Sequence, residues 1–516
     1  MSDRKFRSLG SGLVATAAAG VFGLAALTNP AVARADGEDI GLVIGASGVP
    51  IPGSDYVAAA DFQYLDNQYT HFYPDLTFYG ATSTVPSDIG FYGQGVFTPE
   101  GLYPLTAAGV HQLLLNYPTD ADGYPDQSSS VGQGMAILES TIAADTATGN
   151  TSTVFGYSQS STIASYVMEQ LAAEGVSQKD VNFLLVADPS NPNGGALERF
   201  AGFETTSGQT VSDPLSLPSL GFVFDSATPS DDYVTSIYTL EYDGFADFPR
   251  YPINFLSDLN AFLGIALLHG TYLNGADPAL NSGPSAEEIA NATLLPGSAA
   301  DGTADSLTNY YMIDETAPLV SLLPAKLQEL LGPDLTYLIN LGYGDGSLGY
   351  SDTPADVPTP FGLFPDTSLS TVISTLETDT EQGIQNLISD TDPYTSAALD
   401  TTPSGLSFAD LLSALEADAA NPAASFTEFV NALSSATSAA YSTLLPLTDI
   451  ANALVTSLPS YDLSLFTDSL SNGDLLDALG LPIAADTGMG TLFAGFAFAV
   501  VDRAVTDIVS DFSGLF

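Results

Sequence analysis

Short apolar runs recur along the N-terminal part of the chain and predict strands that are buried on both faces. Three of them, at 39–45, 181–187 and 236–242, have the length and composition of strands in a parallel sheet. Residues 130–144 carry apolar side chains at helical spacing and lead into a further strand-like segment at 152–155. Because strands that alternate with helices build βαβ units, we predict an α/β fold with a mostly parallel central sheet flanked by helices.

The pattern changes near residue 366, where Ala, Ser, Leu, Thr and Asp begin to dominate at helical spacing. We therefore predict an α/β domain at 36–365 and an appended, mainly helical region at 366–516. The apolar run 489–501 is too short to span a bilayer, so we expect a core or interfacial helix there. Prolines are expected to break the C-terminal region into short helices near four positions: Pro403, Pro422, Pro446 and Pro459.

The N-terminus has the three parts of a secretory signal peptide. Three basic residues within the first seven positions precede an apolar run at 13–27, and Ala33-Arg34-Ala35 ends the segment with two small residues. The apolar run contains glycines and is short for a bilayer, so we expect cleavage after Ala35 rather than a retained membrane anchor. Residues 1–35 would then be removed from a secreted mature protein.

Charge and cysteine content narrow the classes of function. The 516-residue chain has 61 acidic and nine basic residues, a formal net charge of −52, and no cysteine. Disulfides and cysteine-based catalysis or metal sites are therefore excluded. A strongly acidic surface repels nucleic-acid phosphates and anionic membranes, so we expect no nucleic-acid partner. Loss of residues 1–35 would remove four basic residues and one acid, which brings the formal charge near −55.

The segment Gly156-Tyr157-Ser158-Gln159-Ser160 lies between a predicted strand and a predicted helix at 161–171. This is the setting of a nucleophile elbow, in which a sharp turn presents a serine in a strained backbone conformation. The turn requires small residues two positions before and two positions after the serine, and Gly156 and Ser160 meet that requirement. The usual last residue is glycine, so Ser160 is a departure that its size allows. An ordinary strand-to-helix turn capped by Ser158 is the alternative interpretation.

A nucleophilic serine needs a base, and the base needs an acid that orients it. The chain has three histidines: His71, His111 and His269. After a nucleophile elbow the chain order is serine, acid, histidine, and only His269 follows Ser158. His269 is therefore the predicted base, with a structural histidine as the alternative. His71 and His111 are assigned to structural or substrate-side roles.

Three aspartates are candidates for the acid. Asp243 follows the predicted strand at 236–242, Asp247 lies in the turn beyond it, and Asp188, the third candidate, follows the strand at 181–187. Acids of such sites often lie a few residues beyond a strand, so we prefer Asp247 and keep Asp243 as the alternative. Most of the 61 acidic residues must be surface charges, so this choice depends on strand context and chain order.

Backbone N–H groups are the expected donors to the oxyanion of an acyl intermediate. One donor is expected from Gln159, the residue after the serine, and the second from Ser47 in the glycine-containing turn 45–48 after the first strand. A plain tight turn at 45–48 is the alternative interpretation. This chemistry uses no metal and no cofactor, and we predict none.

Seven motifs occur in a specific order along the chain. They are Gly45-Ala46-Ser47-Gly48-Val49-Pro50, Thr98-Pro99-Glu100, Gly156-Tyr157-Ser158-Gln159-Ser160, Tyr242-Asp243-Gly244-Phe245-Ala246-Asp247-Phe248-Pro249, His269-Gly270-Thr271-Tyr272, Leu341-Gly342-Tyr343-Gly344-Asp345 and Pro358-Thr359-Pro360. Together they resemble the mycobacterial PE-PPE domain family over about residues 40–365. Two features depart from the family's pattern. Ser47 stands where threonine is frequent, and a cleavable signal peptide is expected in place of an N-terminal PE or PPE module, so type VII export is not implied.

The resemblance implies a secreted serine hydrolase of α/β-hydrolase fold, related to cutinase-like esterases and acting on acyl esters. The family's nucleophile corresponds to Ser158, its histidine to His269, and its acid to the segment 243–247. Some family members instead transfer acyl chains between trehalose glycolipids at the cell envelope.

The leading expectation is hydrolysis of acyl esters through Ser158, Asp247 and His269, with an acyl-enzyme intermediate. The first alternative is transfer of fatty acyl chains between trehalose-type envelope glycolipids by the same residues. The second is a non-catalytic envelope protein that uses the fold and the C-terminal helices for interaction. The expected partner is thus an acyl ester or a glycolipid, and peripheral contact with envelope lipids is a further expectation. Acyl length, acceptor and oligomeric state stay open.

Overall fold

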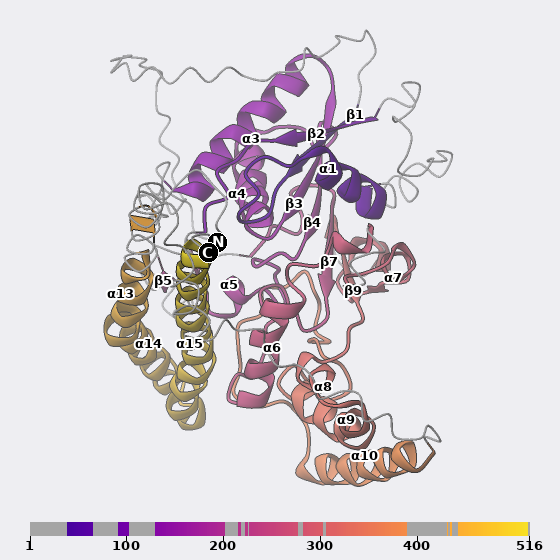
Figure 1. Ribbon diagram of the computed structural model, residues 1–516, viewed down its shortest axis with the longest axis vertical. Helices are drawn as coiled ribbons and strands as arrows, with labels where there is room; N and C mark the ends of the chain where they lie inside the picture. The colour runs from indigo at the N-terminus through magenta and orange to yellow at the C-terminus, as the bar shows by residue number, and fades with distance from the viewer. Residues whose placement is uncertain are drawn as a thin grey trace, which may run out of the picture. The chain divides into compact units, whose positions relative to one another are not determined.

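The computed structural model has a central sheet with the strand order β2-β1-β3-β4-β7-β9-β8 (Figure 1). Every pairing in this sheet is parallel except that of β8 with β9. The strands are β1 Asp39–Ile44, β2 Phe91–Val96, β3 Thr151–Tyr157, β4 Val181–Val186, β7 Thr235–Leu240, β8 Thr293–Leu294 and β9 Thr308–Ile313. The predicted α/β fold with a mostly parallel sheet is therefore confirmed.

The structure describes residues 39–65, 91–102, 129–201, 215–217, 222–224, 227–276, 282–302, 306–389, 431, 434–435 and 442–513. The expected signal peptide and the histidines His71 and His111 lie outside these residues, as do Pro403 and Pro422. The domain boundary near residue 365 stays a prediction.

Helices cover both faces of the sheet. They include α1 Ser54–Ala60, α3 Ser130–Ala147, α4 Gln159–Glu174 and α7 Ala286–Ala290. Val154 and Leu185 pack in one apolar cluster with residues of α3 and α4. Their chain neighbours Phe155 and Leu184 pack in another with residues of α1 and α7. Because successive strand residues point to opposite faces, this alternation explains why the strands are apolar throughout.

The carboxyl ends of four strands carry the strained backbone of the fold. The described non-glycine residues with positive φ are Glu100, Ser158, Ala187 and Tyr242, which follow β2, β3, β4 and β7. Such conformations are costly and persist where the surrounding structure holds them, often at functional sites. In an open parallel sheet, ligands bind beyond the carboxyl ends of the strands, so this edge is the expected location of a site.

Shorter elements connect the sheet to the rest of the chain. They are η1 Asp61–Leu65, α5 Ala196–Arg199, β5 Ser216–Leu217, β6 Phe222–Val223, α6 Phe255–Leu267, η3 Asn274–Ala276, η4 Ala299–Asp301, α8 Pro318–Ser321 and α9 Ala325–Asn340. Strands β5 and β6 form a separate antiparallel pair. Of these elements, α6 matters most to the site, because it ends at Leu267, two residues before His269.

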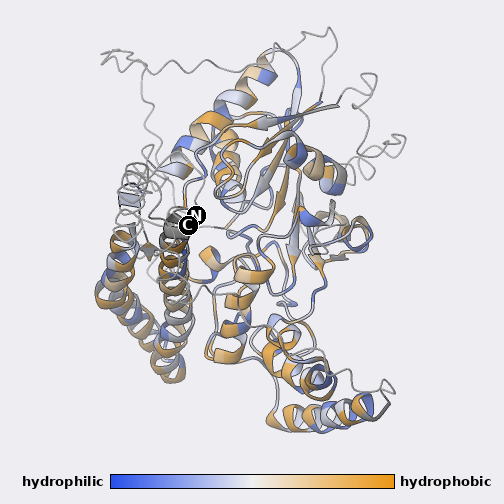
Figure 2. Cartoon of the chain, viewed as in Figure 1, coloured by the Kyte–Doolittle hydropathy of each residue, from blue (hydrophilic) through white to orange (hydrophobic). Residues whose placement is uncertain are grey.

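The C-terminal region is helical where the structure describes it. Its elements are α10 Leu369–Ser389, α13 Leu444–Asn452, η5 Ala453–Ser457, α14 Leu458–Ser471 and α15 Leu475–Ser513. Met489 and Phe493 of α15 share one buried apolar cluster with Phe200 and Phe248 of the α/β part. Figure 2 shows the apolar residues that run along α14 and α15.

A helix begins near Pro446, as expected, whereas the expected break near Pro459 is wrong. Pro446 is the third residue of α13 and Pro459 lies in the first turn of α14, and the helical path continues from α13 through η5 into α14. Pro446 lies in a true first turn, where its missing N–H leaves no hydrogen bond unmade. The π-helical turn η5 ends two residues before Pro459 and widens the otherwise continuous helix locally.

The apolar run at 489–501 belongs to a much longer helix than the sequence analysis expected. Residues 475–507 of α15 form the one candidate membrane span, by length and composition, in the described part of the chain. Half of the apolar window of this helix is buried inside the protein. Leu492 and Phe493 are core residues with 1% exposure, so the buried face of α15 is that of a core helix.

Candidate active site

The turn between β3 and α4 has the geometry of a nucleophile elbow. Ser158 has φ 59° and ψ −117°, and its N–H donates to the carbonyl of Val186 at 3.1 Å. A Cβ atom at Gly156 would lie 2.9 Å from the Ser160 carbonyl oxygen and 3.0 Å from the Leu185 side chain. Glycine at 156 is therefore a steric requirement of this turn.

Ser160, which departs from the usual glycine, has a structural role in the elbow. Its hydroxyl accepts a hydrogen bond from the Tyr157 N–H at 2.7 Å and lies 3.1 Å from the Tyr157 carbonyl oxygen. The side chain is fully buried and provides the hydrogen bonds that the buried backbone groups of Tyr157 need in the absence of water. The serine at position 160 therefore stabilises the turn through hydrogen bonds that a glycine could not make.

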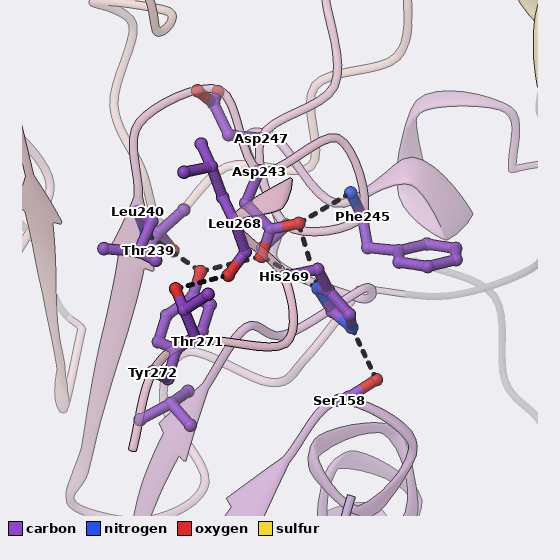
Figure 3. Close-up of polar contacts among 12 residues, drawn as sticks. Ser158, Thr239, Leu240, Asp243, Phe245, Asp247, Leu268, His269, Thr271 and Tyr272 are labelled. Atoms are coloured by element: carbon purple, nitrogen blue, oxygen red, sulfur yellow. Dashed lines mark hydrogen bonds and ion pairs between the residues drawn. The ribbon is translucent and has the colours of Figure 1, made fainter. Parts of the chain in front are cut away.

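A continuous line of polar contacts joins Ser158, His269 and Asp243 (Figure 3). The Ser158 Oγ lies 2.7 Å from His269 Nε2. The His269 Nδ1 lies 2.9 Å from both carboxylate oxygens of Asp243. Because a carboxylate only accepts, it favours the tautomer with the proton on Nδ1, which leaves Nε2 free to accept from the serine hydroxyl.

The carboxylate of Asp243 is fully buried and has three hydrogen-bond partners. They are His269 Nδ1, the Phe245 N–H at 3.1 Å and the Tyr272 hydroxyl at 2.8 Å. The Tyr272 oxygen in turn accepts from the Leu240 N–H at the end of β7. These donors hold the carboxylate in the orientation that faces the histidine.

Asp247, the preferred acid in the sequence analysis, does not contact His269. Its Oδ2 accepts from the Tyr242 N–H at 3.0 Å, and its own N–H donates to the Asp243 carbonyl. The loop thus forms a tight turn between residues 243 and 247. The two aspartate side chains leave it in different directions and bind different groups. Burial raises the pKa of Asp247 well above its usual value, and the nearby Arg199 opposes that shift.

Asp188, the third candidate, is also placed elsewhere. Its two carboxylate oxygens accept from the Ser190 N–H at 3.0 Å and from the Thr228 hydroxyl at 2.6 Å. Burial raises its pKa to about 6, while these hydrogen bonds lower it. Asp243, the alternative in the sequence analysis, is the candidate that the fold brings to His269.

Close packing of α6 against the acid loop sets the position of His269. A Cβ atom at Gly264 would lie 1.8 Å from the Tyr242 carbonyl oxygen, and one at Gly244 would lie 2.2 Å from the Ala261 carbonyl oxygen. The Gly264 carbonyl also accepts the His269 N–H at 3.1 Å. These glycines bring the end of α6, and therefore His269, next to the loop that carries Asp243.

The expected oxyanion donors belong to segments at the same edge of the sheet. Gln159 is the first residue of α4, and Ser47 lies in the turn after β1, the strand that pairs with β3. Within that turn the Gly48 N–H donates to the Glu100 carbonyl and the Val49 N–H to the Ala46 carbonyl, each at 2.8 Å. The oxyanion role of Gln159 and Ser47 stays a prediction.

A buried polar network that was not predicted from the sequence lies beside the elbow. The Gln159 side-chain amide donates to the Gly101 carbonyl at 3.1 Å and accepts from the Ser130 hydroxyl at 2.8 Å. The preceding residue, Glu100, is fully buried, accepts from the Thr98 hydroxyl at 2.6 Å and has its pKa raised by burial to about 8. The motif Thr98-Pro99-Glu100 was the available signal, but it did not indicate a position beside the serine.

Within the described ranges, no group of three or more His, Asp or Glu side chains is arranged to hold a metal ion. The arrangement present is a hydroxyl, an imidazole and a buried carboxylate in hydrogen-bonded sequence. This arrangement can make a serine oxygen nucleophilic by transferring its proton to the imidazole.

Comparisons with known proteins give the relationship of the whole chain. A model of the PE-PPE domain matches residues 90–344. The chain is 36% identical to the uncharacterized PPE family protein PPE28 of Mycobacterium tuberculosis (strain ATCC 25618 / H37Rv), over 96% of this chain and 70% of that protein. The chain is 35% identical to esterase PE16 of the same M. tuberculosis strain, over 63% of this chain and 51% of PE16. It is also 39% identical to the PE family protein PE3, over 50% of each.

The chain therefore spans about half the length of PE16 and PE3. No solved structure matches it. The family model covers the elbow, the acid loop and every strand of the sheet except β1, and the similarity to PPE28 extends over 96% of the chain. The chain belongs to the PE-PPE domain family, as the order of its motifs indicated.

Proposed function

We propose that this protein is a serine esterase that hydrolyses carboxylic esters of acyl chains, with Ser158 as nucleophile, His269 as base and Asp243 as the orienting acid. The observation that carries the proposal is the hydrogen-bonded sequence from Ser158 Oγ through His269 to Asp243, with 2.7 Å and 2.9 Å separations. Membership of the PE-PPE domain family and the similarity to a relative named an esterase support an esterase or lipase activity.

In the proposed reaction, Ser158 Oγ attacks the ester carbonyl carbon while its proton moves to His269 Nε2. Asp243 stabilises the imidazolium that forms, because its carboxylate faces Nδ1 at 2.9 Å. The N–H groups of Gln159 and Ser47 are the proposed donors to the oxyanion. The carbonyl re-forms as the alcohol leaves with the proton from His269, which gives an acyl-enzyme. Water then attacks the acyl-enzyme by the same route and releases the acid.

The direct test of this function is the rate of p-nitrophenol release from p-nitrophenyl butyrate. Ser158→Ala removes the nucleophile and is expected to lower kcat/KM by at least about 10³-fold. Ser140→Ala, an exposed serine on α3, is the matched control and should retain the wild-type rate. Equal rates for wild type and Ser158→Ala would refute the assignment.

Product analysis separates hydrolysis from acyl transfer. Free fatty acid released from a trehalose monoester supports the proposed esterase, since water is then the acceptor. A more heavily acylated trehalose lipid would instead identify a sugar hydroxyl as the acceptor. A correctly folded protein that fails to react with a fluorophosphonate would point to a non-catalytic role.

We also propose that the protein is exported through a cleavable signal peptide at residues 1–35, on the basis of the charge and apolar pattern there. Expression in a secreting bacterial host should give a mature protein whose first residue is Asp36. The intact mass of the secreted protein measures this. A secreted or membrane-bound product that retains residues 1–35 would contradict cleavage.

A further inference from the structure

Three phenylalanine rings form a stack that begins at His269. The Phe245 ring centroid lies 4.7 Å from that of His269, at an interplanar angle of 61°. Phe496 is near-parallel to Phe245 at 5.9 Å and 17°. Phe222 completes the group, 4.9 Å from Phe496 and 5.6 Å from Phe245. We call Phe245, Phe222 and Phe496 the aromatic stack.

The aromatic stack is fixed relative to the reacting groups at its inner end. The N–H of Phe245 donates to Asp243 Oδ1 at 3.1 Å, so the residue that carries the inner ring is also bonded to the acid (Figure 3). Any movement of the Phe245 backbone would disturb the contact between Asp243 and His269. This hydrogen bond fixes the Phe245 backbone beside the acid, and the contacts of its ring with His269 and Phe496 position the side chain.

The outer ring comes from the C-terminal region. Phe496 lies on α15, and α15 packs tightly on the α/β part through glycines. A Cβ atom at Gly495 would lie 2.0 Å from the Phe262 ring, and one at Gly488 would lie 2.7 Å from the Phe200 ring. This close packing holds Phe496, which has 4% exposure, as a fixed part of the surroundings of His269.

Phe222 and Phe245 keep part of their surface open to solvent, unlike Phe496. Partly exposed aromatic side chains at the edge of a core are available to contact an apolar ligand. The same apolar cluster also contacts Leu102, which follows the Gly101 carbonyl that accepts from Gln159. The cluster therefore borders the site both at His269 and near the residue after Ser158.

We propose that the aromatic stack is the binding surface for the acyl chain of the ester, so that helix α15 contributes to acyl-length preference. This inference rests on the proposed esterase function. A linear hydrocarbon chain attached to the carbonyl at Ser158 has no polar group to satisfy and gains binding from contact with aromatic faces. Each methylene that is buried there raises kcat/KM by about two- to fourfold.

The experiment compares kcat/KM for p-nitrophenyl decanoate and p-nitrophenyl acetate. Phe496→Ala removes the outer ring, so the decanoate-to-acetate ratio is expected to fall about tenfold. Phe498→Ala is the matched control, because Phe498 lies two residues further along α15 and is 68% exposed. It should leave the ratio at the wild-type value.

A second variant guards against misfolding, since Phe496 is buried and its loss creates a cavity. Phe222→Ala changes a partly exposed ring and carries the same expectation for the ratio. Circular dichroism and labelling by a fluorophosphonate check that the variants are folded with a reactive serine. An unchanged ratio in Phe222→Ala or in folded Phe496→Ala would overturn the acyl-chain assignment while the esterase proposal stands. If wild type hydrolyses neither ester, the proposed function fails and the inference with it.

Discussion

At the scale of single residues, Asp243 and Asp247 differ in their hydrogen-bond partners. Asp243 faces His269 Nδ1, whereas Asp247 accepts from the Tyr242 N–H. Both are almost fully buried, so burial does not distinguish them. The decisive variable is the direction in which each side chain leaves a tight turn.

These contacts predict different outcomes for two conservative substitutions. Asp243→Asn should lower kcat for p-nitrophenyl butyrate by about 10⁴-fold, because an amide can favour the wrong histidine tautomer. Asp247→Asn should keep kcat within about tenfold of wild type, since an amide oxygen still accepts from Tyr242. A loss of 10³-fold or more in Asp247→Asn, with little change in Asp243→Asn, would restore the original preference.

The proximity of Ser158 and His269 could be predicted from the sequence, but the contact of Asp243 with His269 could not. Strand context singled out Ser158, and histidine scarcity left His269 as the one base after it in the chain. The choice between Asp243 and Asp247 depends on a turn in which the Asp247 N–H folds back onto the Asp243 carbonyl. The sequence of residues 243–247 alone does not determine the direction in which each aspartate side chain leaves this turn.

At the scale of elements, the elbow depends on Gly156 for space. Gly156→Ala should lower the free energy of unfolding by about 1–3 kcal/mol, because its Cβ would crowd the Ser160 carbonyl and the Leu185 side chain. Gly53→Ala is the control, since a Cβ atom at Gly53 meets nothing within 4 Å. Urea unfolding measures both variants. Equal stabilities for the two would contradict the steric argument.

The helices illustrate which element boundaries can be predicted. The buried residues of α3 recur at helical spacing, so its position could be predicted from its apolar pattern. The buried residues of α4 are continuous from Gln159 to Met168, and its position followed from the elbow that precedes it. A helix begins near Pro446 but none ends at Pro459, because the effect of a proline depends on its position and on the local helix geometry. The extent of α15 was missed because its apolar residues continue beyond 489–501 in both directions.

At the scale of the whole molecule, buried carboxyl groups link stability to pH. Burial raises the pKa of Glu100 to about 8, that of Glu241 to about 7 and that of Asp188 to about 6. In the unfolded chain these groups ionise near pH 4. Between these values the folded protein binds more protons than the unfolded chain, so stability must fall as pH rises.

The expected result is a higher midpoint temperature of unfolding at pH 5 than at pH 8. The stabilising contribution is fully present below about pH 4 and is lost as pH rises through the folded-state values, which lie between about 6 and 8. Glu100→Gln should reduce the difference, because glutamine mimics the neutral acid at both pH values. Glu287→Gln serves as an exposed-site control. A protein that is more stable at pH 8 than at pH 5 would contradict the sign.

The arrangement of the C-terminal region on the α/β part was beyond sequence analysis. Phe200 and Phe493 lie in one cluster although nearly three hundred positions separate them, and local patterns carry no information on such pairings. The composition of the region predicted helices with apolar faces, but not the surfaces against which those faces pack. The contact of Phe496 with Phe245, and through it the approach to His269, emerged only from the tertiary structure.

The central claim is that Ser158 is a nucleophile activated by His269 and Asp243. The most direct measurement is the intact mass of the protein after reaction with a fluorophosphonate, followed by peptide mapping of the adduct. A single adduct on Ser158, absent in Ser158→Ala and slowed in Asp243→Asn, is the predicted result. A folded protein that takes up no label, or that carries the label on another residue, would contradict the claim.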